Sequence, residues 1–400
     1  MIVTSLTVTN YRNIAAARFE PAQTLTVICG KNGQGKTNLL ESVWLLTGGK
    51  SFRGAKDLEL VREGCDFSVV EGTVCGGAPA CSAEEQSILL HENRAEPAPA
   101  ETELDLPTAA LPDSSHGDKK TIRIAIAGEG MQPRGRSAKM NGVDYGRATN
   151  LAGVFTAVVF DPGHLSLVKG SPDGRRRFLD AALCQLYPRY LALLRRYTRL
   201  VTQKNALLKS YYQTGGAKEL LDVFDEKLAE CGAAVSERRQ SYLADILPDV
   251  VKNYDDIASG GEALRIEYQP SFAGGGLLQV LHESRARDLA AGFCTTGPHR
   301  EDFSIYIDDR AAKTYASQGQ QRSAVLSLKL AEAAGAQRVT GEHPVMLLDD
   351  VLSELDDTRQ SYLLNRMEDK QTIVTACDAG LFERTSGKIY TMDKGMLAQL

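Results

Sequence analysis

Hydrophobic and polar residues alternate with a period of two at the start of the chain, which is typical of a β-strand. The opening segment, MIVTSLTVTNYRN, shows this alternation, and TLTVICG follows it as a more continuous apolar run. The later segments FSVVEGTVC and TIRIAIAGEG indicate two strands of an antiparallel sheet. Strand-like patterns return towards the other end in LRIEYQP, FSIYIDD, HPVMLLDD and QTIVTACD. We therefore expect α/β structure at both ends of the chain.

Apolar residues at intervals of three or four predict helices. The segment KTNLLESVWLLTGG has this spacing and stops at a glycine pair. From Arg189 to about Ile246, two apolar stripes are separated by TGGAK. A break of that kind between two stripes predicts an antiparallel helical hairpin, in which each helix is about 25 residues long.

These patterns divide the chain into three expected segments. Residues 1–165 and 291–400 would form the two parts of one α/β domain, and residues 166–290 would form a helical domain inserted between them. Within the first part, residues 76–120 hold nine acidic and three basic residues, many Ala and Pro, and little periodicity. That composition predicts a mobile insertion without a packed role.

The overall composition is that of an ordinary globular protein. Of 400 residues, 43% are hydrophobic and 24% are charged. The sequence has no apolar run of membrane-spanning length and no secretory signal pattern at its start, so we expect a cytoplasmic protein without a membrane partner. The eight cysteines are scattered with no C-x-x-C pair, which argues against a metal cluster or a disulfide framework.

Charge is distributed unevenly along the chain. The net charge is −5, yet the segment from Asp161 to Ser210 contains ten Lys or Arg against three Asp. This segment therefore carries +7 and leaves −12 for the remainder. Such an asymmetry predicts a local basic face on an otherwise acidic protein.

The segment GKNGQGKT, Gly30 to Thr37, fits the phosphate-loop pattern G-x-x-x-x-G-K-[ST] between a strand and a helix. Glycines let backbone N–H groups surround phosphate oxygens, Lys36 would neutralise the β- and γ-phosphates, and Thr37 offers a hydroxyl to Mg²⁺. The sequence therefore predicts nucleotide binding by this loop and the residue after it. The expected contacts are Gly30, Lys31, Asn32, Gly33, Gln34, Gly35, Lys36, Thr37 and Asn38.

The segment HPVMLLDDVLSELD supplies the acidic half of such a site. Four apolar residues, Val345 to Leu348, indicate a buried parallel strand that ends in two carboxylates. Asp349 is expected to hold Mg²⁺ through water, and Asp350 is the expected catalytic base for an attacking water. A strand that merely ends in solvated acids is the alternative.

Other motifs narrow the class of nucleotide-binding protein. A GTPase should carry N-K-x-D, and no Asn of this chain precedes Lys. A small-molecule kinase would need lid arginines and no inserted hairpin. A turn before a helix resembles the S-G-G-Q signature of ATP-binding-cassette (ABC) proteins, and SELD (Ser353 to Asp356) occupies the place of their D-loop. This turn consists of Ser317, Gln318, Gly319 and Gln320.

In ABC proteins two subunits pack head to tail, and the signature serine of one touches the γ-phosphate held by the other. The resemblance implies the same for the Ser317–Gln320 turn, which lacks a lysine to hold a phosphate of its own. A plain helix cap is the alternative interpretation of this turn.

The chain resembles the RecF family of recombination mediators over nearly its whole length. The stretches that carry this resemblance are NYRNI, GKNGQGKTNLLE, FDPGHLSLVKGSPDGRRRFLD and LLDDVLSELD, with GPHRED (Gly297 to Asp302) as a looser match. The chain departs from the family pattern at Asp161-Pro162 and at residues 76–120. The resemblance implies an α/β P-loop NTPase fold of ABC-ATPase type, with a mixed sheet core, an antiparallel β subdomain and an inserted helical domain.

The resemblance also implies a function in recombinational repair and replication-fork maintenance. The implied cofactors are ATP and Mg²⁺, and the implied partners are gapped or junction DNA, RecR, RecO and, indirectly, RecA. ATP would drive formation of a homodimer, and hydrolysis would be slow because Asp350 is shorter than the glutamate usual at that place. Arg12 and Asn13 lie where related ATPases contact the nucleotide.

The basic segment supplies candidates for phosphate contacts with DNA, which need no reading of bases. Structural pairing with carboxylates such as Asp173 and Asp180, or a solvated helix face, is the alternative for these arginines. Two other functions remain open: a structural ATPase like the SMC proteins, and an ABC-like ATPase with a protein client and no DNA. The candidate DNA contacts are Arg175, Arg176, Arg195, Arg196 and Arg199.

Overall fold

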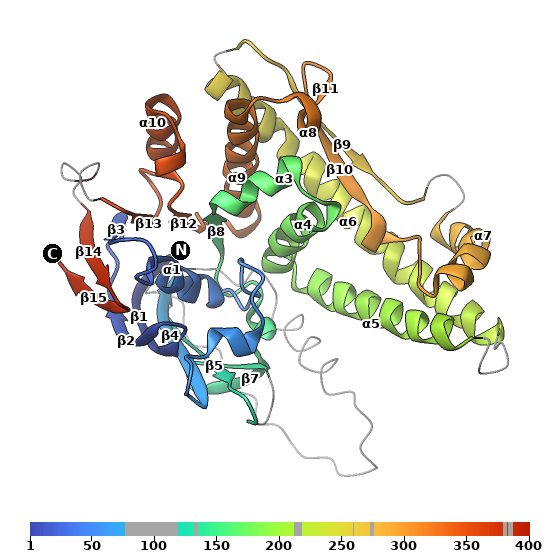
Figure 1. Cartoon of the computed structure of the whole chain (residues 1–400), viewed down its shortest axis with the longest axis horizontal. Helices are drawn as coiled ribbons and strands as arrows, with labels where there is room; N and C mark the ends of the chain where they lie inside the picture. The colour runs from blue at the N-terminus through green and yellow to red at the C-terminus, as the bar shows by residue number, and fades with distance from the viewer. Residues whose placement is uncertain are drawn as a thin grey trace. The chain divides into compact units, whose positions relative to one another are not determined.

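The structure is a computed structural model that describes residues 1–76, 119–131, 135–211, 218–258, 260–272, 276–378, 382 and 387–400 (Figure 1). The expected insertion at 76–120 lies almost entirely outside these residues. Within them, no helix is long and apolar enough to span a membrane, and the cytoplasmic location stays a prediction.

The described chain forms two compact units. The first unit contains Met1–Ala157, Thr340–Leu347 and Glu368–Leu400, and the second contains Val158–Val339 and Leu348–Met367. These bounds differ from the expected segments because the second unit includes strands from the region after residue 290. The three-segment division stays a prediction.

The first unit contains a six-stranded antiparallel sheet in the order β2-β1-β4-β5-β6-β7. Strands β4 and β5 pair along their whole length, from Phe67 opposite Ala127 to Cys75 opposite Lys119, as their alternation predicts. One face of each strand is buried. The strands are β1 (Ile2–Tyr11), β2 (Ile14–Phe19), β4 (Phe67–Cys75), β5 (Lys119–Ala127), β6 (Arg136–Met140) and β7 (Val143–Arg147).

A second six-stranded sheet has the order β15-β14-β3-β13-β12-β8. Strands β13 and β14 run parallel to β3 on either side of it, and β15 pairs antiparallel with β14. This mixed sheet carries the nearly continuous burial expected of parallel strands covered on both faces. The strands are β3 (Leu25–Cys29), β8 (Ala157–Phe160), β12 (Val345–Asp349), β13 (Thr372–Ala376), β14 (Lys388–Asp393) and β15 (Met396–Gln399).

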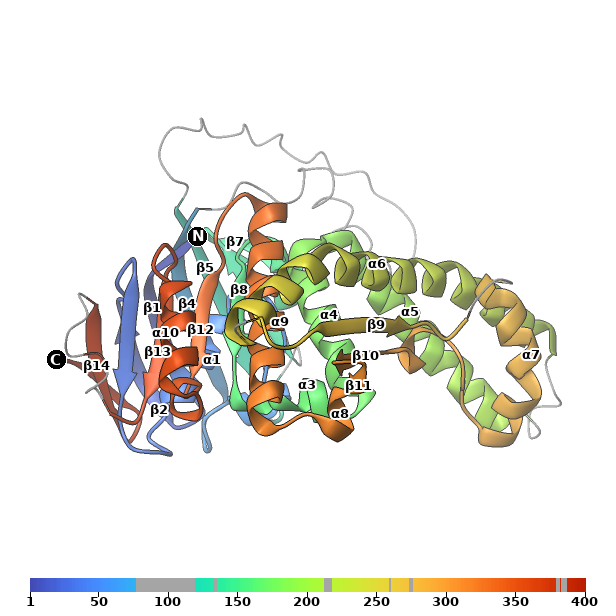
Figure 2. The same ribbon diagram turned by 90° about the horizontal axis from the view of Figure 1, so that it is seen from above.

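Helices dominate the second unit, together with a small sheet of order β11-β10-β9. Figures 1 and 2 show α5 and α6 side by side, with α7 packed against them. The strands are β9 (Leu264–Gln269), β10 (Asp302–Ile307) and β11 (Arg310–Ala311). The longer helices are α4 (Pro172–Leu186), α5 (Pro188–Ser210), α6 (Lys218–Ala258), α7 (Gly276–Ala291), α9 (Gln318–Thr340) and α10 (Asp357–Asn365).

Helices α5 and α6 pack against each other where the hairpin is predicted, but the expected length of the second helix is wrong. Helix α5 has 23 residues, whereas α6 has 41 and continues beyond Ile246 through Pro248. A proline inside a helix removes one hydrogen bond. The apolar stripe nevertheless continues through Val250 and Tyr254, both buried, so packing offsets that loss.

A buried polar cluster ties the helices of the second unit to its small sheet. Glu301, whose side chain is inaccessible to solvent, accepts hydrogen bonds from Ser236 Oγ on α6 and Tyr268 OH on β9, each at 2.6 Å. Arg239 on α6 forms a bidentate pair with Asp180 on α4, with both N–O distances at 2.8 Å. The GPHRED segment that contains Glu301 is therefore a structural junction.

His299 belongs to the same junction. Its Nε2 lies 2.9 Å from Cys294 O and its Nδ1 lies 2.7 Å from Tyr197 OH. Because a carbonyl oxygen can only accept, Nε2 carries the proton and Nδ1 accepts from the tyrosine hydroxyl. Gly297 is required beside it: its φ is +127°, and a Cβ there would lie 2.5 Å from Tyr197 OH.

We predict that the second unit loses stability as the pH falls below neutrality. Burial lowers the pKa of His299 below its ordinary value, and burial together with Lys329 lowers that of His164. As the pH falls, these histidines are protonated in the unfolded chain before they are protonated in the folded protein. Their contribution to the free energy of unfolding is therefore complete above about pH 6.5 and declines below it. Each group contributes at most about 1.4 kcal/mol per pH unit.

Urea unfolding between about pH 7.5 and 5.5 measures this dependence. His299→Gln keeps a side-chain N–H donor for the carbonyl of Cys294 and cannot titrate. Its free energy of unfolding should therefore change less with pH than that of the unmodified protein. An identical pH dependence for both proteins would show that His299 does not contribute.

Candidate nucleotide site

The phosphate loop, Gly30–Thr37, connects β3 to α1 (Lys36–Leu45) in the first unit. Gly35 has φ of +114°, and a Cβ on it would lie 2.7 Å from Asn13 Oδ1. A Cβ on Gly30 would lie 2.3 Å from the carbonyl oxygen of Met392. Both positions need glycine because other residues would clash with atoms that hold the loop.

Lys36 lies against the loop that precedes it. Its side chain is buried, and Nζ donates to Gly30 O at 2.5 Å and to Lys31 O at 3.1 Å. Helix α1 begins at Lys36 and has Thr37 in its first turn. The ammonium group and the first N–H groups of a ten-residue helix thus lie at one end of the loop, which is the arrangement that binds phosphate.

Polar side chains hold the loop from two sides. Asn13 Nδ2 donates to Gln34 O at 3.0 Å, and Asn38 Nδ2 donates to Asn13 Oδ1 at 2.8 Å. From the turn between β14 and β15, Gly395 N donates to Gln34 O, and Lys394 N donates to the Gln34 side chain at 2.6 Å. The loop shape is therefore maintained by the protein's own hydrogen bonds.

Arg12 is held by a buried glutamate that the sequence pattern did not single out. Its Nε lies 2.7 Å from Glu41 Oε2, and Tyr11 OH and Ser51 Oγ donate to the same carboxylate at 2.8 and 2.5 Å. Glu41 is inaccessible to solvent on α1. Burial and Glu41 raise the pKa of Tyr11 well above its ordinary value, so Tyr11 stays a donor. The one signal in the sequence for this buried carboxylate was a glutamate within the apolar pattern of the helix.

We predict that Glu41→Ala lowers the free energy of unfolding by about 3 kcal/mol, because it leaves a partly buried guanidinium without its partner. Chemical denaturation measures the change. Glu20→Ala is the matched control, since Glu20 pairs with Arg18 at an exposed position, and it should cost less than about 1 kcal/mol. Equal costs for the two variants would contradict a special role for the buried carboxylate.

The acidic strand β12 is buried along its length, and the sheet order places β13 between it and β3. Asp349 is its last residue and is 5% exposed. Asp350 follows with φ of +51°, a left-handed conformation, and its carbonyl oxygen accepts from Ser353 Oγ at 2.8 Å. Both aspartates belong to the second unit and the phosphate loop to the first, so a metal ion shared by Asp349 and Thr37 stays a prediction.

The signature turn, Ser317–Gln320, starts α9 as a reciprocal cap. Gln320 N donates to Ser317 Oγ at 3.2 Å, and Ser317 N donates to Gln320 Oε1 at 2.7 Å. Ser317 and Gln318 are exposed. The structure therefore contains the helix cap that was the alternative interpretation, and this cap holds the serine at the surface.

Contacts within the second unit hold the signature helix against the D-loop, Ser353–Asp356. Arg322 pairs with Glu354 at 3.2 Å, and Arg359 Nε donates to Ser323 Oγ at 2.9 Å. Asp356 also caps α10 by accepting from Arg359 N at 3.0 Å. The two motifs therefore form one structural group.

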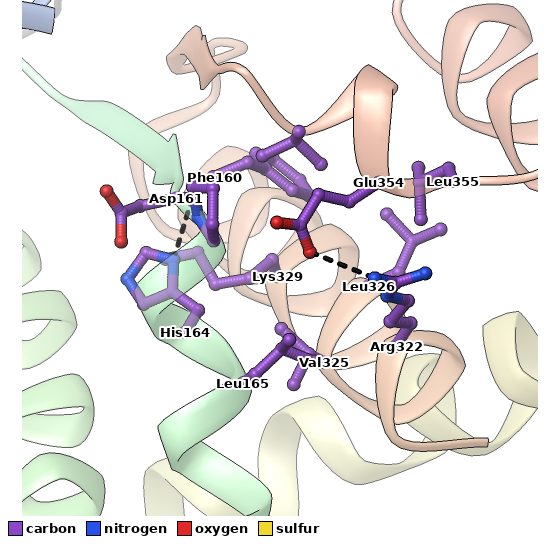
Figure 3. A pocket seen from close by; sticks show the side chains of 12 residues that line it. Phe160, Asp161, His164, Leu165, Arg322, Val325, Leu326, Lys329, Glu354 and Leu355 are labelled. Atoms are coloured by element: carbon purple, nitrogen blue, oxygen red, sulfur yellow. Dashed lines mark hydrogen bonds and ion pairs between the residues drawn. The ribbon is translucent and has the colours of Figure 1, made fainter. Parts of the chain in front are cut away.

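A small pocket of about 40 Å³ opens beside this group (Figure 3). Figure 3 shows the Arg322–Glu354 pair at one side and His164 at the other, with Leu165 and Val325 between them. His164 Nδ1 accepts from Asp161 N at 3.0 Å. The FDPGHL stretch thus packs against the signature helix, and the unusual Asp161-Pro162 order begins the short helix η3 (Pro162–Leu165) with Asp161 as its cap.

Burial argues against a DNA contact by Arg175. Its side chain is only 6% exposed and forms a bidentate pair with Asp302, at 2.6 and 2.8 Å. Its Nη1 donates to Leu167 O and Gly170 O. The local excess of basic residues in the sequence could not reveal that Arg175 pairs with Asp302, which is 127 positions away. Arg175 therefore links α4 to β10.

The other basic residues have varied surroundings. Arg176 pairs with Asp173 and is mostly buried, whereas Arg196 is exposed and lies 3.4 Å from Glu230. Arg199 is also exposed, and Arg195 is intermediate. Lys204 is buried between two carboxylates, so the basic face is smaller than the sequence predicts.

The fold and these motifs define a P-loop ATPase of the head-domain class found in RecF, RecN and SMC proteins. A family model described as "RecF/RecN/SMC N terminal domain" matches residues 2–396. An SMC head domain from Pyrococcus furiosus aligns with a TM-score of 0.51 at 15% identity, covering 100% of this chain and 95% of that chain, and this likeness shows the fold alone.

Relatives of higher identity define the family. The "DNA replication and repair protein RecF" of Lachnoclostridium phytofermentans is 35% identical over 98% of this chain and 96% of its own length. The same-named protein of Ruminiclostridium cellulolyticum is 33% identical over 94% and 92%. A solved structure of the recombination mediator protein RecF with ATP in the RecFOR pathway aligns with a TM-score of 0.83 at 31% identity, over 100% and 97%. The chain belongs to the RecF family, which confirms the resemblance and the expected fold class.

Proposed function

We propose that this protein is an ATP-dependent DNA-binding protein of recombinational repair and replication-fork maintenance, which dimerises when it binds ATP. The observation that carries the proposal is the signature turn: Ser317 is held by its cap at the surface of the second unit, at the start of a 23-residue helix. A helix N-terminus favours an anion. The turn has no lysine to hold a phosphate of its own. The phosphate that it contacts would therefore be one bound by the phosphate loop of a second copy.

The nucleotide would be bound by the phosphate loop, with Arg12, Asn13 and Asn38 beside it. The solved relative with ATP supports this assignment. Thr37 and Asp349 would hold Mg²⁺, which when bound supplies positive charge to the β- and γ-phosphates. Asp350 would act as the base in slow hydrolysis.

Two substitutions at opposite ends of the site test the dimer. Ser317→Arg should leave ATP binding by the monomer nearly unchanged and abolish ATP-dependent dimerisation, because a large cation blocks the exposed turn. Lys36→Ala should abolish both, because it removes the charge in the loop. Nucleotide binding and molecular mass, each measured with and without ATP, separate the two effects.

The two variants are also controls for each other. Loss of monomer binding in Ser317→Arg would place the turn in its own chain's site and contradict the dimer. ATP-dependent dimerisation by Lys36→Ala would contradict the assignment of the phosphate loop.

We also propose DNA as the partner, at gaps or junctions between single and double strands, in cooperation with RecO and RecR to load RecA. Two names support this proposal: a relative is named a DNA replication and repair protein, and the solved structure with ATP is described as part of the RecFOR pathway. Arg176, Arg195, Arg196 and Arg199 stay candidates for phosphate contacts, whereas the burial of Arg175 removes it from the proposal.

Affinity for gapped DNA should fall roughly a thousandfold between about 50 and 200 mM salt, because several phosphate contacts release counterions. Fluorescence anisotropy of labelled gapped DNA, with ATP present, measures this. An absence of binding at low salt would contradict the DNA proposal and favour an ATPase with a protein client.

A further inference from the structure

The arginines of the second unit differ in what neutralises them. Many have a carboxylate within ion-pair distance, including Arg175, Arg176, Arg239, Arg285, Arg322 and Arg359. Arg287 on α7, Arg300 at the end of the short helix η4 (Pro298–Arg300) and Lys209 on α5 have none among the residues that the structure describes. All three are exposed. These three cations therefore lie at the surface without a carboxylate beside them among the described residues.

Arg287 is oriented by hydroxyl groups. Its Nε donates to Thr295 Oγ1 at 2.8 Å and its Nη2 donates to Thr296 Oγ1 at 2.9 Å. The Thr295 hydroxyl in turn donates to the buried carboxylate of Asp288, which Lys204 already neutralises. The guanidinium is therefore fixed in position by neutral acceptors.

Arg300 is oriented in the same way beside an exposed aromatic ring. Its Nε and Nη2 donate to Cys294 O at 3.3 and 3.1 Å, and its guanidinium carbon lies 4.9 Å from the centroid of the Phe293 ring. Phe293 is 39% exposed. The next residue anchors the loop, since Cys294 is buried and its N–H donates to Asn205 Oδ1 at 2.7 Å.

Lys209 brings a third cation to this loop. Its Cγ lies 3.6 Å from the position that a Cβ on Gly292 would occupy, so its aliphatic part passes directly beside the residue before Phe293. An apolar ring thus lies at the surface of a loop, and the neighbouring elements α5, α7 and η4 each bring to it one cation without a carboxylate partner in the part of the chain that the structure describes. We call Lys209, Arg287, Phe293 and Arg300 the Phe293 platform.

We propose that the Phe293 platform binds single-stranded DNA, with one base stacked on the phenyl ring and neighbouring phosphates paired with the cations. The proposal rests on the DNA-binding function proposed above and assigns a site to it. Exposed aromatic rings flanked by cations bind single strands because every base has a π-face and every linkage carries a charge. Duplex bases already stack on each other, so the ring favours the unpaired part of a gap or junction.

Substitutions of the ring test the stacking step in the full-length protein. Phe293→Ala should weaken binding to a fluorescent single-stranded oligothymidine of about 16 nucleotides by about tenfold, whereas Phe293→Tyr, which keeps a flat ring, should stay within about twofold. Phe293→Leu keeps apolar contact with Arg300 but cannot stack, so it should behave like the alanine variant. Phe67→Ala is the matched control, because Phe67 on β4 is 49% exposed and lies in the first unit.

Substitutions of the cations test the phosphate contacts. Arg287→Gln and Arg300→Gln should each reduce the slope of log affinity against log salt by about 0.7 for a single strand. Arg366→Gln is the matched control, since Arg366 is also exposed but pairs with Asp256 at 3.0 Å, and its slope should not change. The urea unfolding transition of each variant verifies that it is folded.

The outcomes separate this proposal from the broader one. If the unmodified protein binds gapped DNA with a steep salt dependence while the Phe293 and arginine variants bind single strands unchanged, the platform proposal is wrong and the DNA function stands. If these variants lose binding only to an acidic polypeptide such as polyglutamate, the platform is a protein-binding surface and the proposal is likewise overturned. If the unmodified protein binds no DNA at low salt, the DNA function fails and the platform assignment fails with it.

Discussion

The fold of the second unit depends on buried charged side chains that need their partners from other elements. Arg239 and Asp180 pair inside the protein, and Glu301 takes its hydrogen bonds from α6 and β9. Removing Asp180 would leave the guanidinium of Arg239, which is only 3% exposed, without its partner and away from water, which is far more costly than breaking an exposed pair. Helices α4 and α6, strand β9 and the start of β10 must therefore assemble together. The loop before this junction carries Phe293 and is anchored by the hydrogen bond from Cys294 N to Asn205 Oδ1.

The first unit also contains a buried charge that is held by hydrogen bonds, the carboxylate of Glu41. Glu41 on α1 accepts hydrogen bonds from Tyr11 and Arg12 at the end of β1, so the helix that follows the phosphate loop is held against β1. Asn13, one residue beyond Arg12, then reaches the loop itself. A sequence motif supplies the residues that surround a phosphate, but contacts with distant segments maintain the shape of the loop.

Local patterns predicted the parts of this structure that local physics determines. Alternation was sufficient for β4 and β5, and an apolar run ending in carboxylates was sufficient for β12. The length of α6 was underestimated because the apolar stripe was followed only to about Ile246, whereas the burial of Val250 and Tyr254 shows that the helix continues through Pro248. Arg175 was misjudged because a sequence shows its charge and hides its partner, Asp302. Glu41 was missed because one polar residue in an apolar helix has no periodicity of its own.

The pairing of β4 with β5 has a consequence for how this chain can change. Cys75 and Lys119 are opposite each other on the last rung of the ladder, so their Cα atoms are only about 5 Å apart. Whatever chain joins them leaves and re-enters the sheet at the same place, and the entropy of closing such a loop grows only slowly with its length. The end of the β4–β5 pair, in the interior of this sheet, is therefore a position where sequence can be gained or lost, in evolution or by genetic engineering, while the strands keep their register.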